Sequence, residues 1–271
     1  MNAITQTLER PEGRIGYDVT GTGPLVVCLP GMGELRSVYR FTVPALVDAG
    51  FRVATMDLRG HGDSDVGFST FDDVAAGTDA LALIEELGGP AVLVGNSMGA
   101  GAAVWAAAER PDLVAGLALI GPFVRNPKMN PLMAWTFRAM MAGPWATRMW
   151  LSYLPRLYPA RKPSDFAEHL AELRESLRRP GYAKAFAATT HTSHAPAAER
   201  LPQVLGKPTL VVMGEKDPDF DDAPAEAAWI TEQLAAECVI VPGAGHYPQA
   251  EFPELVNPAL EAFCRTVTAV G

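Results

Sequence analysis

The sequence predicts an α/β fold: a doubly wound, mostly parallel sheet of about eight strands, with helices on both faces and an inserted helical cap. Three observations lead to this prediction. Short, continuously apolar runs recur along the chain, helix-length segments alternate with them, and the alternation breaks once. Continuous apolarity is typical of strands buried on both faces, and regular strand–helix alternation is typical of parallel sheets.

The predicted strands are runs of four to seven residues, rich in valine, isoleucine and leucine: Pro24–Leu29, Phe51–Met56, Pro90–Val94, Val114–Ile120, Pro208–Met213 and Cys238–Val241. Ile15–Val19 adds a candidate edge strand. Cys28 and Cys238 lie inside such runs, so we expect both to be small core residues. With Cys264 the cysteine count is three, and an odd count without paired spacing argues against a disulfide framework.

Helix-length segments separate these strands: Arg36–Ala49, Asp72–Leu87, Met98–Arg110, Ala223–Ala236 and Phe252–Val267. Asp72 and Asp73 open the second segment, where carboxylates interact favourably with the positive end of the helix dipole.

The alternation breaks between Pro122 and about Pro202, a stretch too long for a plain loop in a compact domain. Within it, apolar residues at spacings of three and four predict a helix over Pro163–Arg179. We therefore expect a core domain of residues 1–124 and 196–271 and a helical cap of residues 125–195.

Composition and charge narrow the function classes. The chain has 271 residues, 48% hydrophobic and 20% charged, with a net charge of −9, which are globular values. No basic run offers a nucleic-acid footprint, and no apolar stretch reaches the roughly 20 residues of a membrane span. The first residues lack a secretory pattern. We expect a cytoplasmic protein whose partner is a small-molecule substrate.

A candidate nucleophile lies in Gly95–Gly99, which reads Gly-Asn-Ser-Met-Gly and matches G-x-S-x-G. This motif places a serine on a sharp strand-to-helix turn, and its flanking glycines let strand and helix approach closely. A predicted strand precedes Ser97 and a strong helix former follows it. A dinucleotide loop is the alternative, but its third glycine would fall at Val104.

A serine hydroxyl needs a base, and histidine is the usual one. Of the five histidines, His61 and His246 lie in loops after predicted strands, where α/β sites assemble. His169 lies in a charged helix, and we expect it to face solvent. Asp217 directly follows a predicted strand and is the candidate orienting acid, with four further carboxylates close by: Glu215, Asp219, Asp221 and Asp222.

Several segments together resemble the α/β-hydrolase superfamily, in particular its esterase-like serine hydrolases with a helical cap: Leu29–Gly33, Asp57–Ser64, Gly95–Gly99, Gly214–Asp217 and Gly245–His246. The resemblance covers essentially the whole chain. It implies a catalytic triad in the superfamily's chain order, with Ser97 as nucleophile, Asp217 as orienting acid and His246 as general base. It also implies a structural role for His61.

The resemblance implies an oxyanion hole made of backbone N–H groups. One donor is the residue after the nucleophile, Met98, and the other lies in the loop after the first central strand, where we expect Met32. Relatives usually carry His-Gly in that loop, whereas this chain has Pro30 and Gly31. This departure removes a supporting side chain and keeps the backbone donors.

The cap is expected to cover the pocket. Five of ten methionines and three of five tryptophans lie between Met129 and Trp150, in a cluster of soft and aromatic side chains: Met129, Met133, Trp135, Phe137, Met140, Met141, Trp145, Met149 and Trp150. The competing interpretations are the cap's own core and an interfacial membrane helix, for which two arginines are too few. The substrate-binding candidates are Gly31, Phe123, Met129, Trp135, Met140, Trp145 and Tyr247.

The reaction expected from the resemblance is hydrolysis of a carboxylic ester of a mostly apolar small molecule through an acyl-enzyme. Carbon–carbon hydrolases of ring-fission products also carry G-N-S-M-G, but they usually have a longer glycine-rich oxyanion loop. Lactonase, thioesterase, amidase, cofactor-free perhydrolase and a catalytically silent ligand-binding protein stay open. Ser97 argues against relatives with an aspartate nucleophile. The cysteines and histidines show no metal-ligand spacing, so we expect neither metal nor cofactor.

Overall fold

The computed structural model describes residues 5–127, 136, 139, 141 and 145–269. In this part of the chain eight strands form one sheet in the order β1-β2-β4-β3-β5-β6-β7-β8. Their bounds are β1 Gln6–Arg10, β2 Gly13–Thr20, β3 Leu25–Leu29, β4 Arg52–Met56, β5 Ala91–Asn96, β6 Val114–Ile120, β7 Thr209–Gly214 and β8 Glu237–Val241. Pairing is parallel from β4 to β8, and β2 is antiparallel to both β1 and β4. The predicted fold class is confirmed.

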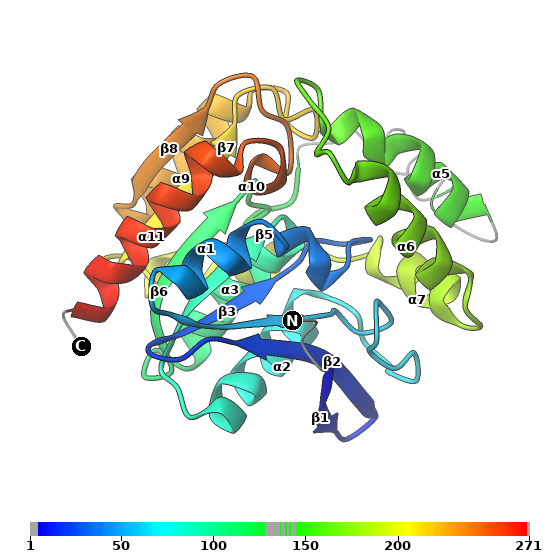
Figure 1. Cartoon of the computed structure of the whole chain (residues 1–271), viewed down its shortest axis with the longest axis horizontal. Helices are drawn as coiled ribbons and strands as arrows, with labels where there is room; N and C mark the ends of the chain where they lie inside the picture. Colours follow the sequence, from blue (N-terminus) through cyan, green and yellow to red (C-terminus); the bar gives the residue numbers. More distant parts are fainter. Residues whose placement is uncertain (1–4, 128–135, 137–138, 140, 142–144, 270–271) are drawn as a thin grey trace.

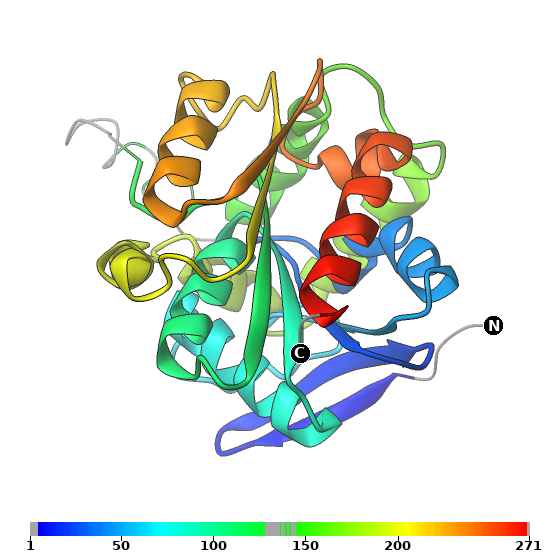
Figure 2. The same cartoon turned by 90° about the vertical axis from the view of Figure 1, so that its left-hand side faces the viewer.

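Helices cover both faces of the sheet (Figures 1 and 2). The helices of one face are α1 (Thr42–Asp48) and α11 (Pro253–Ala269), and those of the other are α2 (Asp73–Leu87), α3 (Met98–Glu109), α8 (Ala195–Arg200) and α9 (Ala223–Leu234). Successive strand side chains point to opposite faces of the sheet. Cys28 of β3 therefore lies in the core under α1 and α11, and Val27 lies in the core on the other face. Burying an aliphatic side chain such as that of Val27 stabilises the fold by about 1.5–3 kcal/mol.

Local sequence signals set the ends of α2. Its N-cap Asp72 accepts a hydrogen bond from the N–H of Ala75 at 2.9 Å, and Gly88 ends the helix in the left-handed region at φ 78°. The helix predicted over Arg36–Ala49 is shorter than expected. It divides into the 3₁₀ turn η1 (Arg36–Tyr39) and α1, and Pro44, which has no N–H to donate, lies in the first turn of α1.

Two predictions about the sheet edges are wrong or incomplete. Cys28 is fully buried as expected, but Cys238 is exposed because β8 is the last strand and has a neighbour on one side only. The first strand, β1, was not expected, since Gln6–Arg10 is mostly polar. It pairs with β2 as an edge hairpin and buries a single residue, Leu8, which leaves little apolar pattern to find.

Between β6 and β7 the chain forms a group of helices, which we call the helical insertion (residues 145–194). It contains α5 (Ala146–Tyr153), the 3₁₀ turn η3 (Leu154–Leu157), α6 (Phe166–Arg178) and α7 (Tyr182–Thr189). These helices lie together, apart from those that flank the sheet (Figure 1). The predicted helix over Pro163–Arg179 is confirmed as α6. In the described ranges, no helix combines the length and apolarity that crossing a bilayer requires.

Candidate active site

Ser97 lies on the turn between β5 and α3. Its backbone has φ 56° and ψ −122°, a strained conformation for a non-glycine residue. The flanking glycines are required by close contacts: a Cβ on Gly95 would lie 2.3 Å from the carbonyl oxygen of Gly99, and one on Gly99 would lie 2.4 Å from that of Leu29. The strand, turn and helix are therefore compressed around Ser97, whose side chain stays partly exposed.

His246 and Asp217 form a buried pair in the loops after β8 and β7. Nδ1 of His246 lies 2.7 Å from Oδ2 of Asp217, and the two residues are 1% and 3% exposed. Because a carboxylate only accepts, Nδ1 carries the hydrogen of this bond. The other ring nitrogen, Nε2, is then the one that can take a proton when the imidazole is neutral.

Two residues join the serine turn to the histidine loop. The side-chain amide of Asn96 donates to the carbonyl of Ile120 at 3.0 Å and to that of His246 at 3.2 Å. Phe123 donates its N–H to the carbonyl of Ser97 at 3.3 Å, and its ring centroid lies 5.9 Å from that of His246. The bridging role of Asn96 was not predicted, although the residue stands inside the glycine motif.

The surroundings of His246 act on its pKa in opposite directions. Burial lowers the pKa, but the negative charges of Asp217 and Asp219 outweigh burial and raise the pKa of His246 to about 9. The imidazolium is therefore the favoured form at neutral pH.

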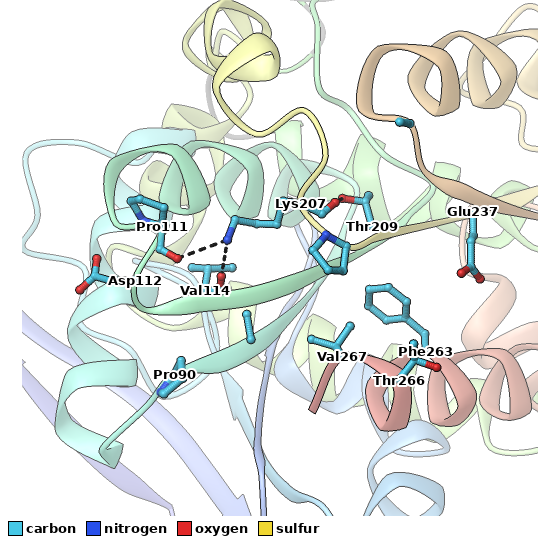
Figure 3. Close-up of a pocket in the computed structure, with 13 residues that line it drawn as sticks. Pro90, Pro111, Asp112, Val114, Lys207, Thr209, Glu237, Phe263, Thr266 and Val267 are labelled. Carbon is cyan, nitrogen blue, oxygen red and sulfur yellow. Dashed lines mark hydrogen bonds between the residues drawn. The ribbon is translucent and has the colours of Figure 1, made fainter. Parts of the chain in front are cut away.

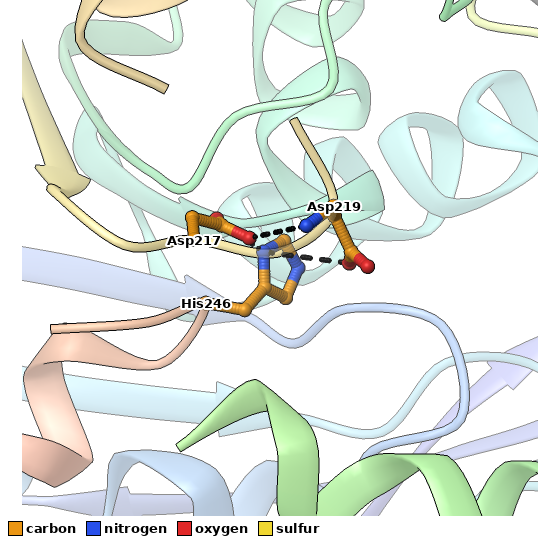
Figure 4. Close-up of side chains that lie close together, drawn as sticks. All are labelled: Asp217, Asp219 and His246. Atoms are coloured by element: carbon orange, nitrogen blue, oxygen red, sulfur yellow. Dashed lines mark hydrogen bonds and ion pairs between the residues drawn. The ribbon is translucent and has the colours of Figure 1, made fainter. Parts of the chain in front are cut away.

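A second carboxylate, Asp219, lies beside the same ring nitrogen, with its Oδ2 3.7 Å from Nδ1 of His246 (Figure 4). Nδ1 and the two carboxylates are close enough together to raise the question of a metal site. Ligand atoms held tetrahedrally around zinc at about 2.0–2.1 Å lie about 3.3 Å apart. The 2.7 Å contact between His246 and Asp217 is shorter and is that of a hydrogen bond, so the group does not fit a metal as it stands.

The loop after β3 forms a turn in which the N–H of Glu34 donates to the carbonyl of Gly31 at 3.3 Å. The N–H of Gly33 donates to Nε2 of His61 at 3.1 Å, and Nδ1 of His61 lies 3.0 Å from the carbonyl of Arg59. Burial lowers the pKa of His61, which keeps it neutral for these two bonds. His61 thus supports the loop, as expected.

The same loop lies close to Ser97. A Cβ on Gly31 would be 2.8 Å from Cβ of Ser97, so glycine is needed for this approach. In the Gly31–Met32 peptide the carbonyl is held by Glu34, which directs the N–H of Met32 the opposite way. Met98 is the first residue of α3, and the first N–H groups of a helix have no partner within it.

Two side chains of the helical insertion form hydrogen bonds with the loop after β3. Nε1 of Trp150 donates to the carbonyl of Gly33 at 2.8 Å. Nε2 of His169 lies 2.8 Å from Oε2 of Glu34, and both residues are almost fully buried. The expectation that His169 faces solvent is wrong, because its ring points inward to this carboxylate. Burial lowers the pKa of His169, but Glu34 reverses this effect and raises it.

The remaining candidate pocket residues have mixed positions. Phe123 is half-buried against His246, and Tyr247 is 1% exposed with its ring centroid 5.1 Å from that of His246. Trp145 is 53% exposed and its Nε1 donates to the carbonyl of Ala139, an outward position that does not fit the predicted pocket lining. Three further candidates lie outside the described residues: Met129, Trp135 and Met140. The same holds for Met133 and Phe137 of the aromatic cluster.

A surface hollow lies at the opposite end of the sheet (Figure 3). Pro90 and Pro208, which precede β5 and β7, line it together with Lys207. The ammonium of Lys207 donates to the carbonyls of Pro111 and Val114, so this ammonium already has backbone partners. Ligands of open α/β sheets bind at the carboxyl ends of the strands, where Ser97, Asp217 and His246 lie. This hollow is no part of the candidate site.

Comparison with known proteins agrees with the fold. A profile of the alpha/beta hydrolase family matches residues 26–259. The chain belongs to this family. It is 30% identical over 266 residues to 2-(acetamidomethylene)succinate hydrolase of Mesorhizobium japonicum, covering 93% of this chain and 92% of the relative.

Two solved structures of named enzymes are also similar. A thermophilic esterase from Thermogutta terrifontis has a TM-score of 0.77 and 27% identity, with 98% of this chain and 99% of that chain covered. Est816, described as an N-acyl homoserine lactone degrading enzyme, has a TM-score of 0.78 and 26% identity, with 95% and 100% covered. The names of these relatives differ in the compound or class of compound acted on, so they support a hydrolase and leave the substrate open.

Proposed function

We propose that this protein is a serine hydrolase that cleaves uncharged carboxylic esters through an acyl-enzyme intermediate. The observation that supports it most is the buried Asp217–His246 pair, which the side chain of Asn96 joins to the strained, glycine-flanked turn of Ser97. In this proposal Ser97 is the nucleophile, His246 the general base and Asp217 the orienting acid.

The reaction would begin when Oγ of Ser97 attacks the ester carbonyl and Nε2 of His246 takes its proton. The carbonyl oxygen becomes an oxyanion, which the N–H groups of Met32 and Met98 stabilise. His246 then gives its proton to the departing alcohol, and the carbon–oxygen bond breaks. A water molecule, activated by the neutral His246, releases the acid and restores Ser97.

The preference for uncharged substrates rests on the charges and rings at the site. The charges that act on His246 are the carboxylates of Asp217, Asp219 and Glu34, which would repel an anionic substrate. Beside His246, Phe123 stacks on Phe220 with ring centroids 4.8 Å apart, which offers an apolar surface. We further propose that residues 125–195 act as a cap over this surface, and that residues 1–124 and 196–271 form the core.

Replacing the nucleophile tests this function. Ser97→Ala should reduce the hydrolysis of p-nitrophenyl butyrate at least about 10⁴-fold, since loss of a triad nucleophile removes most of the acceleration. The melting temperature should change by only a few degrees, because the hydroxyl is partly exposed. Unchanged turnover by the alanine variant would refute the proposal.

A lactonase is a second candidate, because a lactone is a cyclic uncharged ester and the similar Est816 structure is described as lactone-degrading. Parallel assays with p-nitrophenyl esters, an acyl homoserine lactone and a ring-fission dienoate separate these possibilities. Turnover of the dienoate alone would replace ester hydrolysis with carbon–carbon cleavage.

A further inference from the structure

Asp219 is a carboxylate at the site that the proposed ester chemistry does not use. Its backbone N–H donates to Oδ1 of Asp217 at 3.0 Å, on the carboxylate whose other oxygen pairs with His246. Its own Oδ2 lies 3.7 Å from Nδ1 of His246, and its side chain is 20% exposed. Asp219 therefore touches both partners of the buried pair.

A tyrosine from the helical insertion holds this carboxylate in place. The hydroxyl of Tyr153, on α5, donates to Oδ1 of Asp219 at 2.5 Å. Burial and the nearby carboxylates raise the pKa of Tyr153, so its hydroxyl keeps the hydrogen that it donates. With Oδ1 taken by Tyr153, Oδ2 is the oxygen of Asp219 that faces His246.

We propose that Asp219, held by Tyr153, is a second orienting acid for His246 that shares the work of Asp217 and replaces it when Asp217 is lost. This proposal rests on the proposed function, because it needs His246 to act as a base. Nδ1 is already 3.7 Å from Oδ2 of Asp219, so a shift of about 1 Å would bring them to hydrogen-bond distance. Asp219 and Tyr153 are thus positioning residues.

The charged groups around His246 also indicate how Asp219 acts on the pKa of His246. Asp217 and Asp219 come from the loop after β7, Glu34 comes from the loop after β3, and all three favour the imidazolium. The hydroxyl of Tyr153 donates to Asp219, the ring centroid of Tyr247 lies 5.1 Å from that of His246, and Arg156 lies within electrostatic range of Tyr153. Removing the charge of Asp219 should therefore lower the pKa of His246.

The test compares five variants on the ester that the wild type hydrolyses: Asp217→Asn, Asp219→Asn, Asp217→Asn/Asp219→Asn, Asp217→Asn/Tyr153→Phe and the control Asp221→Asn, at an exposed aspartate two residues further on. Replacing the acid of a Ser–His–Asp triad by Asn costs about 10⁴-fold in kcat. We expect Asp217→Asn to lower kcat only about 10- to 100-fold, and both double variants to lower kcat about 10⁴-fold.

The pH profile provides a readout that a purely structural role would not change. Asp219→Asn should move the rising limb of kcat/KM to lower pH by at least about half a unit, whereas Asp221→Asn should leave it in place. If Asp217→Asn is as inactive as the double variants, or if Asp219→Asn keeps the wild-type limb, the second-acid proposal is overturned. Tyr153→Phe removes one hydroxyl only. If an Asp219 variant misfolds, the Asp217→Asn/Tyr153→Phe variant still tests the proposal.

The two proposals fail in different ways. If ester hydrolysis itself is wrong, the wild type and Ser97→Ala give equal rates. If only the second acid is wrong, the wild type still hydrolyses the ester and Ser97→Ala does not.

Discussion

The core and the helical insertion contribute to the candidate site by different means. The core contributes close backbone contacts together with side chains such as those of Asn96 and His61. The turn at Ser97 and the approach of Gly31 and Gly95 to their neighbours leave no room for a Cβ. The insertion contributes mainly single side chains, such as Trp150 on Gly33 and Tyr153 on Asp219. It adds one backbone contact, because the carbonyl of Leu157 accepts from the N–H of His246 at 2.9 Å. The core therefore fixes where Ser97, Asp217 and His246 lie, and the insertion supports the loops around them.

This difference implies that changes in the core should be severe and changes in the insertion graded. A backbone contact cannot relax without moving a strand or a helix, whereas a side-chain hydrogen bond can be removed with limited repacking.

Gly95→Ala should have the largest effect on stability. Its Cβ would lie 2.3 Å from the carbonyl oxygen of Gly99, so β5 and α3 must move apart. We expect a loss of about 3 kcal/mol in the free energy of unfolding, measured with urea, together with loss of ester hydrolysis. The control is Gly50→Ala, at φ 94° with nothing within 4 Å, which should cost about 1 kcal/mol and leave activity intact. Equal costs at the two positions would contradict the packing explanation.

The pH dependence of activity should reflect the environment that the core gives His246. In the proposed mechanism His246 must be neutral to take the proton of Ser97, and its pKa is raised to about 9. Below that pH, kcat/KM should rise about tenfold per unit. A rate profile over pH 6–10 measures the rise, and a plateau already reached at pH 7 would show that the carboxylates do not raise the pKa as described.

The core was largely predictable from the sequence because its signals are local. Apolar runs predict six of the strands, and the glycines around Ser97 indicate a turn that only small residues allow. The loop positions of Asp217 and His246 followed from the strand ends. For Met32 the sequence offers only its place after Gly31, because its side chain takes no part in the predicted role.

The insertion was less predictable because its contacts join residues far apart in the chain. His169 stands among charged residues in α6 and was expected to face solvent, whereas its partner Glu34 lies 135 positions earlier. Nothing in the sequence near Trp145 and Trp150 distinguishes the exposed tryptophan from the one that binds Gly33. The prediction that Cys238 is a core residue is wrong for a related reason, since an apolar run does not indicate whether its strand lies at an edge of the sheet.

Trp150→Phe should separate the insertion from the core most clearly. It keeps an aromatic ring and removes the Nε1–H that Gly33 accepts at 2.8 Å. The loop after β3 then loses one of its supports, and kcat should fall about tenfold with KM within about twofold. Trp145→Phe is the matched control, because this 53% exposed residue should tolerate the change. Equal effects of the two variants would argue against a role for the insertion in this loop.

The smallest expected effect concerns the buried pair of His169 and Glu34. Glu34 raises the pKa of His169 above its unfolded value near 6.5, so the pair's contribution to stability is full below pH 6.5. It is lost as pH rises through the folded pKa. His169→Gln should therefore cost about 1 kcal/mol at pH 6 and less at pH 9, measured by urea unfolding beside the wild type. If the loss of stability caused by His169→Gln increases with pH, the prediction is contradicted.

Covalent labelling of the serine tests the central proposal most directly. A fluorophosphonate reacts only with a serine that a base activates and an oxyanion hole assists. Peptide mass spectrometry of the treated, folded protein should place the adduct on Ser97, and urea-unfolded protein should stay unlabelled. Folded protein that remains unmodified while a known esterase reacts beside it would contradict the proposed nucleophile.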